Sequence, residues 1–517
     1  MNATTTSLDH ACVISGNRRS GKDEIAARAA RAATGLSRAG VGQGDTVALL
    51  LRNDIAIFEA STAATLLGAY PVPINWHFKP DEIAYILNDC KAKALVAHRD
   101  VLKNLPTPLP AGILLLVVDT PPELVSAYGV PGAEAAPAAA RLWDEWLSDY
   151  EPWTGAPQLT SSVIYTSGTT GKPKGVLRPP MTQEQAQRAF AMVAGMYGFQ
   201  AGEAIRTVIT GPMYHTAPNG YALTTFRFGG TVVLQPRFDP LGLLELIEKY
   251  RITHLHLVPT MFVRLLKLSD EERRAHDLSS LRFVSHGAAP CSPKVKQAMI
   301  DWWGPVINEY YGSTETGGIT VQSSQEALQK PSSVGRPLPG VKLRICDEAG
   351  KPLGTGAVGN IHIHTTAMPG FNYLGKSGAQ AQIDAEPYVW VGDIGYLDEE
   401  GYLFLCDRRS DIINSGGVNI YSAEIEAALM EMPGITDCAV FGIPDDEYGE
   451  SVCAHLVAEP GAALNEEGIK AFLRERLSGY KVPRRIVFDT ALPREESGKV
   501  FKRKIREPYW AKAERAI

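Results

Sequence analysis

The sequence has few cysteines, and no two of them are spaced like a metal or redox motif. Its 517 residues include seven cysteines, at positions 12, 90, 291, 346, 406, 438 and 453. Without a C-x-x-C pair, a zinc site or a thioredoxin-like motif is not expected. Scattered thiols are typical of reducing compartments, so we expect a cytoplasmic protein.

Signals for a membrane or for nucleic acid are also missing. The stretch MNATTTSLDH at the start lacks the basic and apolar regions of a signal peptide. Apolar runs such as ILLLVV (113–118) are far shorter than the ~18 residues of a membrane-spanning helix, so we expect no transmembrane segment. The net charge of −6 gives no reason to expect a nucleic-acid partner.

Short apolar runs alternate with helix-like stretches through the first three hundred residues. DTVALLL (45–51) and HLHLV (254–258) are typical of buried strands, while KDEIAARAARAATGLSRAG (22–40) has the spacing of an amphipathic helix. This alternation predicts an α/β fold with crossover helices. The stretch 120–160 is rich in proline, alanine and acidic residues, which predicts a surface excursion between subdomains.

The pattern changes near residue 337. Glycine-punctuated strands such as VKLRICD and GNIHIHT predict a small β-rich subdomain over about 337–409. The stretch that follows DRRSD (407–411) has its own helices and strands, enough for a compact α+β unit. We therefore predict a large N-terminal domain of α/β subdomains over 1–409, which includes the β-rich subdomain, and a small C-terminal domain over 410–517.

The loop YTSGTTGKPKG (165–175) follows the apolar segment SSVIYT. Glycines let backbone N–H groups converge on an anion without obstruction by a Cβ atom. Serine and threonine hydroxyls add donors, and Lys172 and Lys174 add positive charge. A flexible solvated loop would share the glycine content, but hydroxyls and lysines directly after a strand favour a phosphate-binding loop.

A second glycine-lysine pattern, GNRRSGKD (16–23), has nearly the spacing of a P-loop. Asp23 stands where a P-loop carries the serine or threonine that binds the metal, and its charge would repel phosphate. We interpret this match as coincidental, which argues against a P-loop NTPase.

Other polar residues lie at the ends of strand-like segments. Glu315, after Thr314 in NEYYGSTETGG, has the oxygen ligands that Mg²⁺ prefers, and Tyr311 can stack on a base. Asp393 in YVWVGDIG could accept hydrogen bonds from both ribose hydroxyls, with Arg408 fifteen residues later. Taken alone, each residue is more often structural.

Together these segments resemble the adenylate-forming enzymes, which include acyl-CoA synthetases, luciferases and adenylation domains of peptide synthetases. The resemblance spans nearly the whole chain, and the motifs occur in the family's order. They are YTSGTTGKPKG, PMYHTA (212–217), SHGAAP (285–290), YYGSTE (310–315), GRPLPG (335–340), YVWVGDIG, DRRSDIINSGGVNI and GKVFKRK.

The resemblance implies a nucleotide site. It implies that Asp393 and Arg408 bind the ribose. The residues it implies for the phosphate loop are Thr166, Ser167, Gly168, Thr169, Thr170, Gly171, Lys172 and Lys174. Those it implies for the adenine site are Gly287, Ala288, Ala289, Tyr311 and Gly312.

The resemblance also implies two half-reactions. In the first, Thr314 contacts the α-phosphate, Glu315 holds Mg²⁺ and Lys499 stabilises the charge that develops between carboxylate and phosphate. The C-terminal domain, mobile in this family, then rotates about a hinge at Ser410, where the family more often has Asp or Lys. The rotation presents the thioester loop, Ser415, Gly416 and Gly417.

The motif PMYHTA bears on the substrate. Relatives that activate amino acids carry an aspartate in this motif, whereas this sequence has His215. A buried ammonium without a partner costs several kcal/mol, so amino acids are disfavoured. His215, a predicted catalytic residue, is expected to gate an acyl tunnel or to contact the substrate; the alternative is a histidine that is merely packed.

The sequence therefore predicts an ATP-dependent acid–CoA ligase, with Mg²⁺ as cofactor and a fatty, aryl or other bulky apolar acid as substrate. The chain ends soon after Lys499 without a carrier domain, which favours free CoA as the acceptor. The expected partners are the small-molecule acid, ATP and CoA, and a homodimer is allowed. Alternatives are an adenylating enzyme with another acceptor, a carrier protein or a luciferase-like oxidant, or a non-catalytic nucleotide-binding relative.

Overall fold

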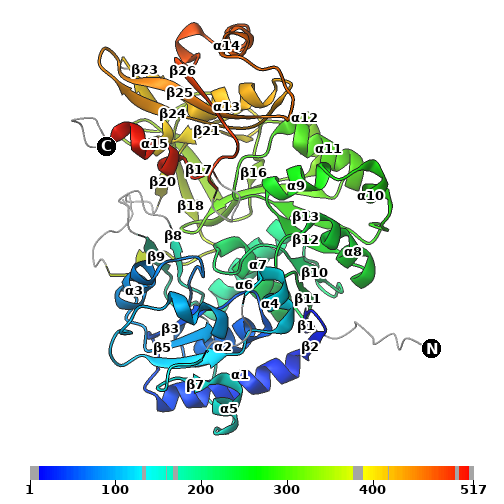
Figure 1. Ribbon diagram of the computed structural model, residues 1–517, viewed down its shortest axis with the longest axis vertical. Helices are drawn as coiled ribbons and strands as arrows, with labels where there is room; N and C mark the ends of the chain where they lie inside the picture. Colours follow the sequence, from blue (N-terminus) through cyan, green and yellow to red (C-terminus); the bar gives the residue numbers. More distant parts are fainter. Residues whose placement is uncertain are drawn as a thin grey trace.

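The structure is a computed structural model that describes residues 11–130, 135–158, 160–166, 173–375, 388–416, 418–494 and 500–511. Figure 1 shows early elements of the chain, in blue and cyan, at one end of the molecule and the last ones, in orange and red, at the other. The predicted α/β class, with a large N-terminal and a smaller C-terminal part, is confirmed. No helix in the described ranges is long and apolar enough to cross a membrane.

One sheet has five parallel strands in the order β4-β3-β5-β6-β7. Every residue of β3 and β5 is buried, because both faces of this parallel sheet are covered, and all of them except Thr46 and His98 are apolar. The strands are β3 (Thr46–Leu50), β4 (Tyr70–Pro73), β5 (Ala94–His98), β6 (Leu114–Val118) and β7 (Arg141–Leu142).

Helices connect these strands. In the first of them, Asp23 and Glu24 lie in the first turn and Arg38 in the last, where they complement the helix dipole, and apolar positions from Ile25 to Leu36 form one buried face. The helices are α1 (Lys22–Arg38), α2 (Ile55–Leu66), α3 (Pro80–Asp89), the 3-10 helix η1 (Arg99–Asn104), α4 (Pro122–Tyr128) and α5 (Trp143–Ser148).

The prediction of a surface excursion at 120–160 is wrong. This stretch contributes β7, which pairs with β6, and α5, whose Trp143 and Trp146 are about 2% and 1% exposed. Trp146 lies so close to α1 that a Cβ atom on Gly35 would come within 2.5 Å of its ring. Two large aromatic side chains anchor this stretch in the core, although its average composition is polar.

A nine-stranded sheet forms the middle of the molecule, in the order β16-β15-β14-β13-β12-β10-β11-β1-β2. Six strands from β14 to β1 in this order are parallel, and the β1–β2, β14–β15 and β15–β16 pairings are antiparallel. The strands are β1 (Cys12–Ser15), β2 (Arg18–Gly21), β10 (Arg206–Ile209), β11 (Thr231–Leu234), β12 (His254–Leu257), β13 (Phe283–His286), β14 (Ile307–Ser313), β15 (Gly317–Gln322) and β16 (Arg336–Pro337).

Apolar side chains fill both faces of this sheet. One face shares its core with α1, α2, α6 and α7, so the two parallel sheets are held by one continuous cluster, and the other face packs against α8, α9 and α11. The helices are α6 (Gln183–Tyr197), α7 (Thr216–Arg227), α8 (Pro240–Tyr250), α9 (Pro259–Leu266), α10 (Asp270–Arg274), α11 (Pro293–Trp303) and α12 (Ser324–Gln329).

The P-loop-like residues 16–23 form the β1–β2 turn, β2 and the start of α1. Because β2 pairs antiparallel with β1, its backbone groups are used in the sheet and do not form a phosphate cradle. This geometry agrees with the interpretation of the pattern as coincidental.

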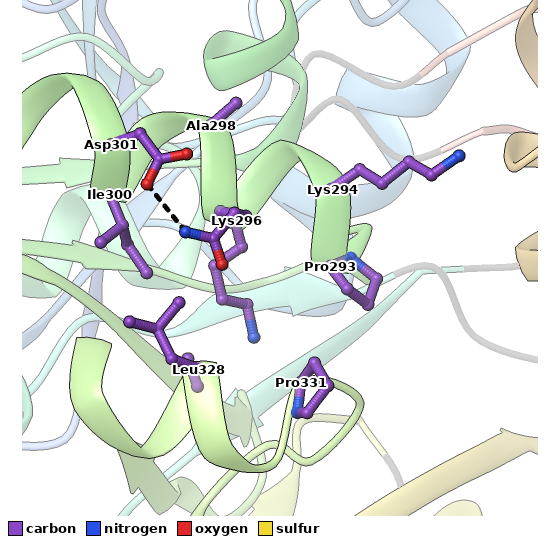
Figure 2. Close-up of a pocket in the computed structure, with 10 residues that line it drawn as sticks. Pro293, Lys294, Lys296, Ala298, Ile300, Asp301, Leu328 and Pro331 are labelled. Carbon is purple, nitrogen blue, oxygen red and sulfur yellow. Dashed lines mark hydrogen bonds between the residues drawn. The ribbon is translucent and has the colours of Figure 1, made fainter.

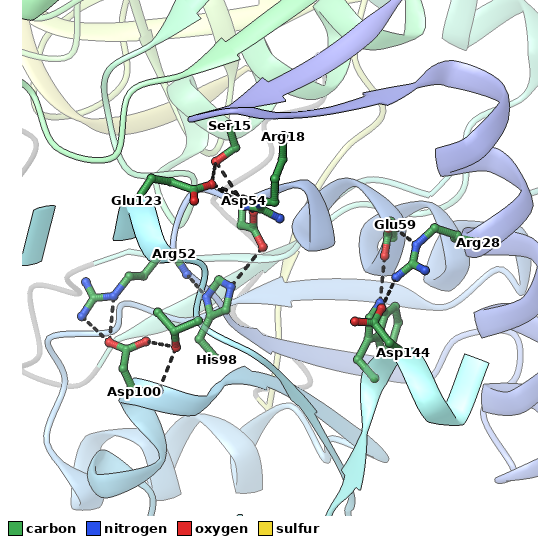
Figure 3. Close-up of polar contacts among 12 residues, drawn as sticks. Ser15, Arg18, Arg28, Arg52, Asp54, Glu59, His98, Asp100, Glu123 and Asp144 are labelled. Atoms are coloured by element: carbon green, nitrogen blue, oxygen red, sulfur yellow. Dashed lines mark hydrogen bonds and ion pairs between the residues drawn. The ribbon is translucent and has the colours of Figure 1, made fainter. Parts of the chain in front are cut away.

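A buried polar network ties this hairpin to the five-stranded sheet (Figure 3). Asp54 Oδ2 lies 3.2 Å from His98 Nε2, and the other carboxylate oxygen pairs with Arg18. Arg18 also pairs with Glu123 at 2.7 Å, which accepts a hydrogen bond from Ser15 at 2.8 Å. Burial opposes ionisation of Asp54, but His98 and Arg18 outweigh it and lower its pKa to about 2.

Two smaller sheets follow. The strands β19-β9-β8 form a three-stranded sheet, with β8 (Ile164–Thr166), β9 (Lys174–Leu177) and β19 (Asn372–Tyr373). The β-rich region forms an antiparallel sheet of β17 (Val341–Cys346), β18 (Gly359–Thr365), β20 (Val389–Leu397) and β21 (Leu403–Arg408).

The C-terminal unit has its own five-stranded sheet and its own apolar core. Its longest pairing joins β24 and β25. The elements are the 3-10 helix η2 (Arg409–Asp411), β22 (Ile413–Ser415), β23 (Val418–Ile420), α13 (Ser422–Met430), β24 (Ile435–Asp445), β25 (Gly449–Ala458), α14 (Glu466–Arg474), the 3-10 helix η3 (Gly479–Lys481), β26 (Arg485–Asp489) and α15 (Lys502–Trp510).

Candidate active site

The two ends of the predicted phosphate loop are joined. Thr166 at the end of β8 is the partner of Lys174 at the start of β9, with Thr166 Oγ1 3.5 Å from the Lys174 carbonyl oxygen. The Lys174 ammonium lies 5.4 Å from the centre of the Tyr373 ring. The other predicted loop residues, Ser167, Gly168, Thr169, Thr170, Gly171 and Lys172, lie outside the described residues.

The turn between β14 and β15 carries Thr314 and Glu315. Thr314 Oγ1 lies 2.6 Å from the hydroxyl oxygen of Thr216, the first residue of α7. Tyr373 donates a hydrogen bond from its hydroxyl to Glu315 Oε1 at 3.2 Å. The two predicted catalytic side chains are therefore each held by a hydroxyl group from a distant segment.

Tyr311, Asp393 and Arg408 meet at one point. Asp393 is the partner of Arg408 in the β20–β21 pairing, and Arg408 Nε donates to Asp393 Oδ1 at 3.1 Å. The Tyr311 hydroxyl donates to Asp393 Oδ2. Burial raises the pKa of Tyr311 well above its ordinary value, with a further rise from Asp393, so the phenol stays a donor. The carboxylate predicted to bind ribose is thus fixed by the ring predicted to stack on adenine.

The predicted adenine segment follows β13 directly. Gly287 packs against Tyr310, where a Cβ atom would come within 2.6 Å of the Tyr310 carbonyl oxygen, so only glycine fits. Ala288 has φ of 67°, an uncommon backbone conformation that costs of order 1 kcal/mol and is found mainly at functional turns. Ala288 is exposed and Ala289 half-buried, so this turn lies at the surface of the protein. Gly312 is also required, because a Cβ atom there would meet the Gly317 carbonyl oxygen at 2.3 Å.

His215 precedes α7 at the end of a loop that Asn53 holds. Asn53 Nδ2 donates to the Gly211 carbonyl oxygen at 2.8 Å, and Asn53 Oδ1 accepts from the Met213 N–H at 2.8 Å. Asn53 is about 3% exposed and comes from the segment before α2. One buried amide thus fixes the backbone on which His215 is carried.

Ser415, the last residue of β22, and Gly416, which follows it, line a cavity of about 270 Å³ together with Tyr448, Tyr480 and Arg484. Gly417 and Lys499 lie outside the described residues, and so does the side chain of Ser410, whose backbone belongs to η2. Arg494 and Val500, on either side of the segment that contains Lys499, pair as an antiparallel bridge.

Asp407 links the two sides of the predicted hinge. Its carboxylate accepts hydrogen bonds from the Ser422 hydroxyl at 2.9 Å and from the Ala423 N–H at 3.2 Å, at the start of α13. Lys502 in α15 donates to the same Ser422 hydroxyl oxygen at 2.8 Å and pairs with Glu426 at 2.8 Å. The start of α13 is therefore held both from the N-terminal side of Ser410 and from the last helix.

Comparison with protein families gives two matches. The family of AMP-binding enzymes matches residues 1–370, and the C-terminal domain of AMP-binding enzymes matches residues 424–499. The chain belongs to the AMP-binding enzyme family. The resemblance to adenylate-forming enzymes is therefore confirmed.

Similar members of this family are ligases. The chain is 32% identical to a feruloyl-CoA synthase of Amycolatopsis over 94% of its own length and 93% of that protein. It is 34% identical to a Mycobacterium tuberculosis CoA ligase for a 7a-methyl-1,5-dioxo-octahydroindenyl propanoyl group, over 96% of both chains. The amide bond synthetase McbA from Marinactinospora thermotolerans has a similar structure, with a TM-score of 0.82, 27% identity and coverage of 97% and 98%. The prediction of an enzyme, an acid–thiol ligase, is confirmed.

Glu315 is the one residue predicted to hold Mg²⁺. Within the described ranges, no three histidine, cysteine, aspartate or glutamate side chains gather into a metal cluster. Glu315 can fit Mg²⁺, because Tyr373 bonds only its Oε1 atom. A hard cation held by one carboxylate would take its other ligands from phosphates and water.

A cavity of about 460 Å³ lies elsewhere, between α11 and α12 (Figure 2). Lys296, at its edge, is paired with Glu309 and donates to Gln322 Oε1 at 3.1 Å. None of the predicted site residues lines this cavity. We therefore assign this cavity no part in the reaction, although its volume would admit a small molecule.

Four residues of the site were not predicted. Thr216 lies in the PMYHTA motif and Asn53 shortly after the DTVALLL segment, but their partners are distant in the sequence, so no local spacing indicates them. Tyr373 and Arg178 both contact Glu315, and only the β9–β19 pairing brings them there. The glycine-rich spacing that identified the loop contains no information about that pairing.

Proposed function

We propose that this protein is an ATP-dependent acid–CoA ligase, which converts a carboxylic acid to an acyl-adenylate with release of pyrophosphate, and then to acyl-CoA with release of AMP. The observation that carries the proposal is the meeting of Tyr311, Asp393 and Arg408 beside the Thr314–Glu315 turn. Asp393 would bind the ribose, Thr314 the α-phosphate and Glu315 the Mg²⁺ ion. Groups in this order would accept a nucleotide in one orientation.

In the first half-reaction the acid's carboxylate attacks the α-phosphorus, and pyrophosphate leaves. The nucleophile is already an anion, so no general base is required. The barrier comes from bringing negative charges together, which cations and N–H donors placed beforehand reduce. We assign this role to Lys174, Thr314 and Lys499. Mg²⁺ bound at Glu315 would neutralise phosphate charge.

In the second half-reaction the thiol of CoA attacks the acyl carbon, and AMP leaves. We propose that the domain from 410 onward turns about Ser410, withdrawing Lys499 and bringing Ser415, Gly416 and Gly417 to the site. The contact of Asp407 with the start of α13 must break or rearrange in that turn, since the two lie on opposite sides of Ser410. Such a domain motion separates two reactions that need different groups at one place.

We further propose that the acid is bulky and apolar, of the aryl, polycyclic or fatty kind. Support comes from the names of the relatives, a feruloyl-CoA synthase and a CoA ligase for a bicyclic propanoate. The loop before α7 carries His215 and no carboxylate that could pair with a substrate ammonium. A cytoplasmic location, where ATP and CoA are supplied, agrees with the scattered cysteines.

The test is a panel of aryl, polycyclic, fatty and amino acids, each supplied with ATP, Mg²⁺ and CoA and assayed for AMP, pyrophosphate and acyl-CoA. We expect AMP and acyl-CoA in equal amounts with at least one apolar acid. Release of ADP and phosphate in place of AMP would refute the proposal. AMP formation that no acid stimulates, or that proceeds with a carrier protein or an amine but not with CoA, would refute the assignment of the acceptor.

A further inference from the structure

Arg178 is a buried cation next to the nucleotide site. It follows β9 directly, after the predicted phosphate loop, and is about 7% exposed. Its guanidinium donates to three backbone carbonyl oxygens: Pro369 at 2.7 Å, Thr314 at 3.0 Å and Glu315 at 2.6 Å. The backbone of both predicted catalytic residues of the β14–β15 turn is therefore held by one side chain.

Both terminal nitrogens of the Arg178 guanidinium donate to acceptors, but these acceptors are uncharged carbonyl oxygens. Within the described part of the chain, no carboxylate oxygen lies within the 4.0 Å of an ion pair with it. Other buried cations differ: Arg52 pairs with Asp100 at 2.7 Å, and Lys296 pairs with Glu309. Burial lowers the pKa of Arg178 to about 10, and only Glu315 acts in the opposite direction.

An unpaired buried charge normally destabilises a protein, because the charge loses its hydration without gaining a partner. Such a charge is tolerated where a ligand of opposite sign arrives beside it, because the preorganised charge then stabilises the bound anion. The triphosphate of ATP is the anion that the Thr314–Glu315 turn would receive.

We propose that Arg178 is a positioning residue of the nucleotide site, which fixes the Thr314–Glu315 backbone and whose charge is balanced by the phosphates of bound ATP. The inference rests on the proposed function, because it needs the turn to bind phosphate. The affinity for ligands with a polyphosphate should therefore depend on Arg178. The affinity for the nucleoside part, which would bind at Tyr311 and Asp393, should not.

The experiment compares binding of Mg–ATP and of adenosine by calorimetry, in the full chain and without acid or CoA. Arg178→Gln keeps a donor for the carbonyl groups and removes the charge, while Arg178→Lys keeps the charge and loses the fork of donors. We expect Arg178→Gln to weaken Mg–ATP binding by roughly 10- to 100-fold and adenosine binding by less than about threefold. Arg178→Lys should retain ATP affinity within about tenfold.

Arg264→Gln serves as the matched control. Arg264 lies on α9, and its guanidinium also donates to a backbone carbonyl oxygen, that of Phe238. A parallel fall of ATP and adenosine affinity in Arg178→Gln would show that Arg178 only braces the fold and would overturn the inference. Unchanged ATP affinity would overturn it too. If Arg178→Gln does not fold, Arg178→Lys decides in the same way: a parallel loss of both ligands contradicts the inference, and a retained ATP affinity supports it. Absence of ATP binding by the unsubstituted protein would refute the proposed function itself.

Discussion

Thr216 and Thr314 lie 98 residues apart in the chain, yet their hydroxyl oxygens are 2.6 Å apart. One residue begins α7, directly after His215, and the other lies in the turn between β14 and β15. The contact therefore joins the segment expected to face the acid with the segment expected to face the α-phosphate. The two reactants would meet where these segments meet.

Thr216→Val should lower the rate of acyl-adenylate formation by roughly tenfold, because Thr314 loses the partner that orients its hydroxyl, a loss of about 1–1.5 kcal/mol. Thr216→Ser retains the hydroxyl and should stay near the unsubstituted rate. The measurement is acid-dependent exchange of pyrophosphate into ATP. As a control, Thr34→Val in α1 removes a hydroxyl bonded only to its own helix. Equal rates for Thr216→Val and Thr216→Ser would contradict the prediction.

Asn53→Ala should raise KM for the acid more than KM for ATP. The substitution leaves the Gly211 carbonyl and the Met213 N–H unpaired in a buried place, at a cost of about 1–3 kcal/mol for each group. The loop that carries His215 would then relax while the nucleotide residues remain in place. The control is Asn104→Ala, which removes one hydrogen bond, to the Trp76 carbonyl oxygen. A rise in both KM values by the same factor would show a general loss of structure.

His256 should make the fold sensitive to mild acid. Burial lowers its pKa from an ordinary value near 6.5 to about 4, and its Nε2 atom lies 2.9 Å from the Tyr310 hydroxyl. Between pH 6.5 and pH 4 the unfolded chain therefore binds a proton that the folded chain does not, so stability falls as pH falls through this window.

His256→Gln should remove this part of the pH dependence. The free energy of unfolding of the unsubstituted protein should fall by about 2 kcal/mol more than that of the variant between pH 7.5 and pH 5. Urea unfolding at the two pH values measures the difference, and His77→Gln, at an exposed position, is the control. Parallel pH profiles for the protein and the variant would exclude His256 as the source.

Lys499→Ala should separate the two half-reactions. Loss of a cation that stabilises developing charge typically costs ~3–4 kcal/mol, or roughly 10²–10³ in rate, so formation of the adenylate should nearly stop. The thioester step starts from an adenylate already made, so synthetic acyl-adenylate and CoA should react at close to the normal rate. Both rates are measured on one preparation. A fall of both by the same factor would argue against the domain rotation.

Most of the architecture could be predicted, because short stretches of sequence are enough to indicate a strand, a helix or a motif. The runs that became β3 and β5 are mostly apolar, and the predicted glycine-rich loop starts at the end of β8. The YYGSTE motif overlaps the end of β14, whereas Asp393 lies within β20 and not at the end of a strand. The contacts between motifs could not be predicted. Only the completed sheets bring together the segments that these hydrogen bonds join: Tyr311 to Asp393, Asn53 to the Gly211 carbonyl oxygen, and Arg178 to the Glu315 carbonyl oxygen.

The stretch 120–160 shows the opposite failure. Its proline, alanine and acidic residues predicted a surface excursion, whereas Trp143 and Trp146 are buried in the main core. Average composition hides two side chains that bury more apolar area than many small ones together. For such segments, the positions of tryptophans are a better guide than the average polarity.

Asp407 has a consequence for how the predicted hinge could vary among related proteins. A helix cap is worth about 0.5–2 kcal/mol, and about 1.4 kcal/mol changes the ratio of two conformations tenfold. If the cap at Ser422 and Ala423 exists in one orientation of the C-terminal unit and not in the other, then positions 407 and 422 set the resting populations of the two orientations. Single substitutions at these positions, far from either substrate, would then change the balance between activating an acid and delivering it to the acceptor. An uncharged residue such as serine is sufficient at position 410, because the contacts of Asp407, and not the hinge residue, would set the ratio of the two orientations.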